Sequence, residues 1–228
     1  VGPARLRTIV TENWRRGIGP TWRAFGDPRP FTTTGPAGIP VLAQNGDSSY
    51  VSGVYYTAEL SPTEGFGVEA LISSPIAQDR WQIVSINLVG DVDSAALAAW
   101  DHTTGYGPLA HAQDACGAIL PAAESRRLLD HLFLSTLGTT PVMPYHPGLR
   151  SGRWWRLRVQ VLPDGRCGVA VNGKPVWLSE RPIRTDLRYR LSLQGMSFHT
   201  RILFGPVEVW QGVRRDVDWE AAARRPPQ

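Results

Sequence analysis

The sequence is short of three things: long apolar runs, lysine and cysteine. No run of about 18 apolar residues occurs in the 228-residue chain, so no membrane-spanning helix and no direct membrane insertion are expected. Lys174 is the only lysine among 24 basic residues, and the chain has 2 cysteines. The first residues, Val1 to Arg5, do not resemble a secretory leader. This abrupt start favours a mature or excised fragment, and any anchoring would come through a missing segment or a partner.

The formal net charge of +4 and the pI of about 9.4 raise the question of nucleic-acid binding. The distribution of the charge argues against it. The arginines are interspersed with acidic and apolar residues and form short pairs, such as those at 126–127, 214–215 and 224–225, in place of a continuous stripe. A nucleic-acid-binding face carries a continuous basic patch or stripe. Nucleic acid is therefore not expected as a partner.

Cys116 and Cys167 are about 50 residues apart and share no metal-type spacing. His102 and His111 could complete a zinc site with Cys116, but scattered histidines are more often surface or hydrogen-bonded core residues. The cysteines are either buried free thiols or one disulfide. If the chain works outside the cytoplasm, the disulfide is favoured, and it would stabilise the fold by about 3–4 kcal/mol.

The clearest strand pattern lies between residues 153 and 210. In its first arm one apolar face alternates with one more polar face, made by Trp154, Arg156, Arg158 and Gln160. Pro163-Asp164-Gly165 predicts a reverse turn. Asn172-Gly173 predicts a two-residue hairpin turn, because both residues accept positive φ. The stretch therefore reads as an antiparallel meander.

Three more alternating runs, at 54–60, 66–72 and 81–89, predict strands in the first half, and residues 32–49 look like surface loop with one short strand at 39–42. An irregular insert is expected at about 91–150. Within it, residues 122–134 predict one helix, since leucines recur at helical spacing. A short C-terminal helix is expected after residue 216, capped by Asp216 or Asp218. The fold class is therefore all-β, with two packed antiparallel sheets in a single domain of residues 1–228.

Residues 155–173, of the form Trp-x-Leu-x-Val-x-Val-Leu-Pro-Asp-Gly-x-x-x-Val-x-Val-Asn-Gly, resemble a hairpin of concanavalin A-like, laminin G-type jelly-roll domains. Residues 191–195 and 202–210 are similar to the closing strands of that family, and 52–54 and 65–70 to its early strands. The resemblance implies a concanavalin A-like β-sandwich of the lectin and glucanase superfamily. It does not decide the function, because this architecture carries lectins, glycan hydrolases and protein-binding ectodomains.

A hydrolase of this architecture would place two or three carboxylates on alternate residues of one strand. The resemblance therefore implies a Glu-x-Asp-x-x-Glu-like run, and the sequence has none. Asp91 and Asp93 fall in an expected loop, and Asp216 and Asp218 in the C-terminal tail. Glu69 lies in an expected strand without a second carboxylate at two-residue spacing, and pairing with an arginine such as Arg156 or Arg158 is its expected role. The chain is therefore not expected to be an enzyme.

Calcium is the one cofactor that the resemblance leaves open. Oxygen ligands at the rim of a laminin-type sandwich could come from residues in two expected loops: Asn45, Asp47, Asp91 and Asp93. Asn45-Gly46-Asp47 is also a common turn sequence, so these residues have a structural interpretation as well.

The chain has 9 tryptophans, and several fall on the polar face of an expected strand. A flat indole beside hydrogen-bonding side chains is what a sugar ring needs, so a concave sheet face could bind carbohydrate. The candidate ligand-binding residues are Trp81, Ser85, Asn87, Trp100, Trp154, Arg158 and Gln160. Alternatively, the inserted helix covers this face, or the aromatics form a protein interface.

Two functions follow from these alternatives. The first is a non-catalytic, extracytoplasmic recognition module, periplasmic or secreted, that binds carbohydrate. The second is a structural or protein-interaction domain that holds a partner in a larger assembly.

Overall fold

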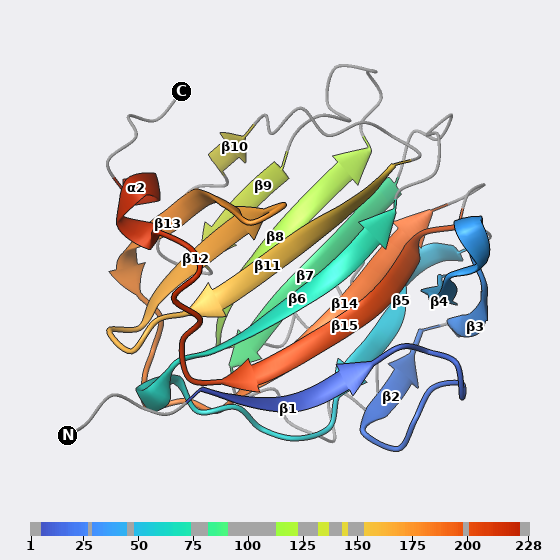
Figure 1. Ribbon diagram of the computed structural model, residues 1–228, viewed down its shortest axis with the longest axis horizontal. Coiled ribbons are helices and arrows are strands. Elements are labelled where there is room, and N and C mark those ends of the chain that lie inside the picture. Colours follow the sequence, from blue (N-terminus) through green and yellow to red (C-terminus); the bar gives the residue numbers. More distant parts are fainter. Residues whose placement is uncertain are drawn as a thin grey trace.

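The computed structural model describes residues 6–26, 29–44, 48–73, 82–90, 113–122, 132–136, 143–145, 153–197 and 201–223. These residues form two antiparallel sheets packed face to face, as Figure 1 shows. The predicted all-β sandwich is confirmed.

Sheet A lies toward the viewer in Figure 1. Its strand order is β13 (Lys174–Pro182), β12 (Arg166–Val171), β11 (Trp154–Val161), β6 (Phe66–Ser73), β15 (Leu203–Gln211), β4 (Pro40–Ala43) and β3 (Phe31–Thr34), with β1 (Arg7–Glu12) also paired to β15. Sheet B lies behind it. Its order is β10 (Met143–Tyr145), β9 (Leu132–Thr136), β8 (Asp114–Ala122), β7 (Gln82–Gly90), β14 (Tyr189–Ser197), β5 (Ser48–Tyr56) and β2 (Trp22–Phe25). Two 3-10 turns, η1 (Pro36–Gly38) and η2 (Pro62–Glu64), and one helix, α2 (Trp219–Ala223), complete the described elements.

The core lies between the sheets and is built by alternation. On β11 the inward residues are those expected from the sequence, and all are buried: Trp155, Leu157, Val159 and Val161. The facing strand β7 of sheet B contributes Val84, Ile86 and Leu88. Because successive side chains of a strand point to opposite faces, the residues between these lie on the outer faces of the sandwich.

The Asn172-Gly173 turn joins β12 to β13 as predicted. The two residues have φ of 50° and 78°, and Val171 pairs with Lys174 across the turn. Asn172 also fixes the neighbouring strand, since its Oδ1 accepts a hydrogen bond of 2.8 Å from the backbone N–H of Arg156.

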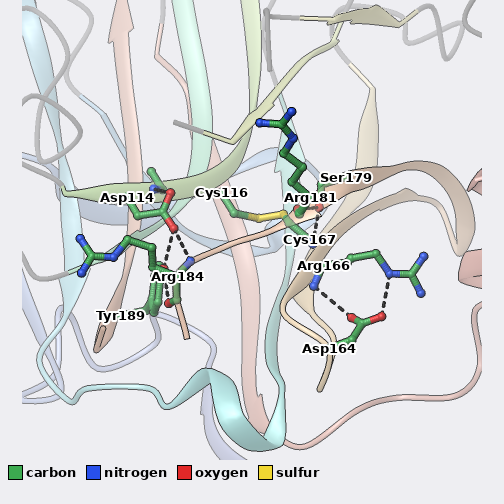
Figure 2. The surroundings of a disulfide bond; sticks show 10 residues. Asp114, Cys116, Asp164, Arg166, Cys167, Ser179, Arg181, Arg184 and Tyr189 are labelled. Carbon is green, nitrogen blue, oxygen red and sulfur yellow. Dashed lines mark hydrogen bonds and ion pairs between the residues drawn. A yellow bond between two sulfur atoms is a disulfide. The ribbon is translucent and has the colours of Figure 1, made fainter. Parts of the chain in front are cut away.

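Cys116 and Cys167 form a disulfide between β8 of sheet B and β12 of sheet A, with their Cα atoms 6.2 Å apart (Figure 2). Of the two interpretations of the cysteines, the disulfide is therefore the one observed. A disulfide sulfur does not serve as a thiolate ligand, so the zinc hypothesis with Cys116 is wrong.

A polar cluster lies beside the disulfide in Figure 2, centred on the buried carboxylate of Asp114. It accepts hydrogen bonds from the Tyr189 hydroxyl at 2.8 Å and from the backbone N–H of Arg184 at 2.7 Å. Burial and the adjacent carboxylate raise the pKa of Tyr189, so the phenol stays protonated. The cluster ties the start of β8 to the segment that leads into β14.

The expected helix at 122–134 is wrong at both of its ends. Ala122 is the last residue of β8, and Leu132–Thr136 is strand β9, which pairs with β8; residues 123–131 lie outside the described part. The insert at about 91–150 likewise contains three strands of sheet B, β8 to β10. Leucine is also accepted in a strand, so helical spacing alone does not exclude one. Pairing of residues 132–136 with β8 therefore outweighed the local helical pattern.

The short C-terminal helix is confirmed as α2, and Asp218 caps it: the N–H of Ala221 donates to its carboxylate at 3.2 Å. Asp216 instead accepts hydrogen bonds from the guanidinium of Arg158. No helix in the described residues is long and apolar enough to cross a membrane.

Replacing both cysteines by alanine should lower the free energy of unfolding by about 3–4 kcal/mol, because the unfolded chain regains the freedom that the cross-link removed. Urea denaturation followed by tryptophan fluorescence would measure the change. Wild-type protein unfolded with a thiol reductant is the matched control and should behave as the double variant does. A double variant within about 0.5 kcal/mol of the oxidised wild type would contradict the expectation.

Candidate functional site

The structure does not bring the expected ligand-binding residues together on one face. Trp154, Arg158 and Gln160 point outward from β11 of sheet A, whereas Ser85 and Asn87 point outward from β7 of sheet B. The outer faces of two packed sheets look in opposite directions, so a single groove made of both sets is wrong. Alternation predicts which face of a strand is polar, but it does not say to which sheet the strand belongs. Trp81 and Trp100 lie outside the described residues.

The outer face of sheet B carries a small polar lattice at its centre. Asn87 lies opposite Ser192 and Ser85 opposite Gln194 on the neighbouring strands β7 and β14. Asn87 Nδ2 donates to Ser85 Oγ at 3.0 Å, and Ser192 Oγ donates to Gln194 Oε1 at 3.0 Å. All four side chains are buried. This lattice is a neutral, internally hydrogen-bonded layer without an accessible surface.

The outer face of sheet A is organised by Arg158, whose side chain is only 5% exposed. Its Nε donates to Glu69 Oε2 at 3.0 Å, and its Nη1 and Nη2 donate to the two carboxylate oxygens of Asp216 at 2.6 and 3.0 Å. Glu69 lies directly opposite Arg158 on β6, as its expected pairing with an arginine requires. Arg156 is more distant, with Nη1 3.9 Å from Glu69 Oε1.

Burial opposes the charge on Arg158, but hydrogen bonds and the negative charges of Asp216 and Glu69 outweigh it and raise the pKa of the guanidinium. The hydrogen bonds from Arg158 likewise lower the pKa of Asp216. Arg158 and Asp216 therefore form an ionised pair at neutral pH, and Glu69 Oε2 lies 2.8 Å from Nη2 of the same guanidinium. The two carboxylates come from residues far apart in the sequence, and no spacing rule could have joined them.

The segment that follows β15 crosses the outer face of sheet A, as the red trace in Figure 1 shows. We call residues 212–219 the C-terminal strap. Asp216 of the strap binds Arg158. The Arg214 guanidinium lies 4.0 Å from the centre of the Trp210 ring. Val217 and Trp219 belong to a small second core. Gly67 is required beneath the strap, because a Cβ there would lie 2.5 Å from the Trp210 ring. Trp210 thus lies on the outer face of sheet A, but it is fully buried.

An open hollow of about 440 Å³ remains beside the strap, and we call it the Trp154 hollow. Its lining comes from β6, β11, the β12–β13 turn and the strap: Glu69, Leu71, Trp154, Trp155, Arg156, Arg158, Asn172, Gly173 and Asp216. The side chains of Arg156 and Asp216 are 68% and 61% exposed, and Trp154 is partly buried. Two of the expected ligand-binding residues, Trp154 and Arg158, therefore meet here, whereas Gln160 lies buried beneath the strap, with its Nε2 3.5 Å from the Arg214 carbonyl.

The hollow offers three kinds of contact to a ligand. The indole of Trp154 and the side chain of Leu71 are apolar, the guanidinium of Arg156 donates hydrogen bonds, and the carboxylates of Glu69 and Asp216 accept them. Charges of both signs are present in equal number among these residues and Arg158. Such a surface suits an uncharged ligand with one flat apolar face and several hydroxyl groups.

Metal ligands are not assembled within the described part of the chain, where no group of three or more His, Cys, Asp or Glu side chains could hold an ion. The calcium candidates Asn45, Asp47, Asp91 and Asp93 all lie outside those residues, so calcium stays a prediction from the sequence.

No protein-family model and no curated protein matches the sequence. Solved structures do resemble it. The Emp47p carbohydrate recognition domain has a TM-score of 0.61 at 12% identity, over 87% of this chain and 92% of that chain. Lectin II from Ulex europaeus has 0.62 at 8% identity, over 90% and 98%. LamA from Z. galactanivorans, in complex with laminaritriose and laminaritetraose, has 0.58 at 10% identity, over 90% and 98%.

The chain therefore has the concanavalin A-like lectin and glucanase fold, and the resemblance seen in the sequence is confirmed at this level. Identities of 8% to 12% show a shared fold only. The ligand must be argued from this chain's own residues.

Docking of the C-terminal strap should weaken in acid. Because the pKa of Asp216 is lowered in the folded chain, its ion pair contributes stability above the unfolded carboxyl pKa of about 4 and loses it as pH falls through the lower folded value. Hydrogen exchange of residues 212–219, corrected for intrinsic rates, should show protection at pH 6 that declines below about pH 4.

Asp216→Asn should remove about 1 kcal/mol of that protection at pH 6 and flatten its acid dependence. Asp186→Asn is the matched control, because Asp186 also has a lowered pKa but pairs with Arg184, which donates its other hydrogen bonds to Gln113 and Asp114 at the start of β8. Equal pH profiles for Asp216→Asn and wild type would exclude Asp216 as the group responsible.

Proposed function

We propose that this chain is a non-catalytic, extracytoplasmic carbohydrate-binding module whose ligand sits in the Trp154 hollow. The observation that carries the proposal is the hollow itself, which joins a partly exposed indole to hydrogen-bonding groups of both kinds on one open surface. A pyranose ring has the complementary chemistry, with an apolar face of C–H groups and a rim of hydroxyls.

The hollow is also held in shape before any ligand arrives. Trp154 and Arg156 lie on a central strand of sheet A, and the backbone N–H of Arg156 is bonded to the Asn172 side chain. Glu69 and Asp216 are fixed by Arg158. Rigid positioning lowers the entropy cost of binding, which matters for weak ligands such as sugars.

Two further observations support the proposal. The buried disulfide is typical of proteins that work outside the cytoplasm. Among the similar solved structures are a carbohydrate recognition domain and a lectin, and we carry their binding class, not their ligands, to this chain.

The arrangement of carboxylates favours binding over hydrolysis. Glu69 lies directly opposite Glu208 across β6 and β15, but Glu69 is bound by Arg158 and Glu208 by Arg214. Both carboxylates are thus already engaged by arginines, whereas the two carboxylates of a glycosidase face the sugar that they act on. This arrangement suits hydrogen-bond acceptance.

Trp154→Ala should weaken binding of glycans selected on an array by at least about tenfold, the loss expected for removing a stacking surface worth about 1.5 kcal/mol. Isothermal titration would measure it, with and without calcium. The melting temperature should change little, because Trp154 is only partly buried. Trp154→Phe keeps an aromatic face and should retain most of the affinity.

Arg23→Ala, at an exposed position on the outer face of sheet B, serves as the second control and should bind as wild type does. If Arg23→Ala loses binding and Trp154→Ala does not, the ligand sits on sheet B and the proposed hollow is wrong. If the wild-type protein binds no glycan on the array, either with or without calcium, the proposed carbohydrate-binding function is wrong.

A further inference from the structure

Within the described residues, three strands of sheet A pair with one neighbour only: β13, β3 and β1. The pairing of β1 with β15 is irregular, with a register shift between Thr8 and Val10, and β13 has several protective features. β13 contains Pro175 and Pro182, its register with β12 shifts twice, and helix α2 packs against it. It also carries the exposed charges of Lys174, Glu180 and Arg181. Prolines, irregular register, charges and a covering helix are the features by which edge strands resist pairing with another chain.

β3 has none of these features. It reads Phe-Thr-Thr-Thr and pairs with β4 in a regular register from Phe31 opposite Ala43 to Thr34 opposite Pro40. Threonine and phenylalanine favour extended backbone. In an antiparallel pair alternate residues direct N–H and C=O away from the partner, and within the described ranges no strand other than β4 pairs with β3. Its outer edge is therefore a row of backbone donors and acceptors.

Arginines flank this edge on both faces of the sheet. On the outer face, the Arg201 guanidinium carbon lies 5.1 Å from the centre of the Phe31 ring. On the inner side, where the neighbouring Trp14 is part of the core, Arg15 lines a second hollow of about 540 Å³ together with Thr32, Thr33 and Thr34. Arg29 precedes the strand by two residues. All three arginines are exposed, and no carboxylate of the described residues forms an ion pair with them.

The turn that carries Arg15 is held firmly in place. Trp14 adopts φ of 61°, an unfavourable conformation for a bulky residue, and its indole Nε1 donates to the Gly205 carbonyl at 2.7 Å. Glu12 Oε1 accepts hydrogen bonds of 2.9 Å from the N–H groups of Asn13 and Trp14. Strain of this kind persists only where the surroundings enforce it, so the position of Arg15 is set by the fold and not by chance.

We propose that β3 is a docking edge for an acidic, extended segment of a partner protein, which adds to sheet A as a further strand. Backbone hydrogen bonds to β3 would supply affinity, and successive side chains of the added strand would face Arg15 on one side and Arg201 on the other. Acidic residues at consecutive positions therefore fit both faces. This surface lies on a different part of sheet A from the Trp154 hollow and does not depend on sugar binding.

A fluorescein-labelled octapeptide, Val-Val-Glu-Glu-Val-Val-Glu-Glu, is the probe, and anisotropy is the readout. It should bind, and the same peptide with lysine in place of glutamate should not. Arg15→Glu and Arg201→Glu should each weaken binding at least about tenfold, because attraction becomes repulsion. Arg181→Glu, a charge reversal on the protected strand β13, is the matched control and should change the affinity by less than about twofold.

Two N-methylated versions of the peptide test the strand geometry itself. One version is methylated at the odd-numbered amides and the other at the even-numbered amides. Only one of these two sets of amides can face β3, so one version should lose binding and the other should keep it. Equal binding of both versions would overturn strand addition. The proposal also fails if the acidic peptide does not bind the wild type, or if Arg181→Glu weakens binding as much as Arg15→Glu does. Circular dichroism and an intact disulfide would confirm that each variant is folded.

Discussion

A single buried guanidinium governs the outer face of sheet A. Arg158 is almost completely withdrawn from water, and burying a charge costs several kcal/mol unless partners offset it. Glu69 on the next strand and Asp216 on the C-terminal strap are those partners. The position of the strap, the burial of Trp210 beneath it and one wall of the Trp154 hollow all follow from this one requirement. Losing either carboxylate would leave the charge incompletely paired in a site that water hardly reaches.

The strap converts a two-layer sandwich into a partly three-layered one. Two large indoles lie against the outer face of sheet A where glycines leave room for them: Trp210 against Gly67, and Trp219 against Gly168. A side chain at either glycine would collide with the ring at about 2.5 Å. The outer face of sheet A is therefore covered by the strap on one side of Asp216 and open to solvent on the other. Asp216 lines the Trp154 hollow at this boundary.

Local pattern predicted local structure well. The alternation of β11, the Asn172-Gly173 turn and the pairing of Glu69 with an arginine were all legible, because each depends on neighbours in sequence or on an adjacent strand. Contacts and sheet membership that depend on residues far apart in the sequence could not be predicted. The polar faces of β7 and β11 were expected to share a groove although they belong to different sheets. Nothing in the spacing of residues indicated that Asp216 would reach Arg158, and the threonines of β3 read as loop because short edge strands carry little pattern.

The scarcity of lysine has a practical meaning once the fold is known. Lys174, the only side-chain amine, stands at the first position of β13, immediately after the Asn172-Gly173 turn that borders the Trp154 hollow. Amine-coupling chemistry directed at side chains would therefore tether the protein to a sensor surface at the rim of the hollow and obstruct it. The same coincidence makes Lys174 a natural attachment point for a single reporter dye that sees whatever enters beside Trp154.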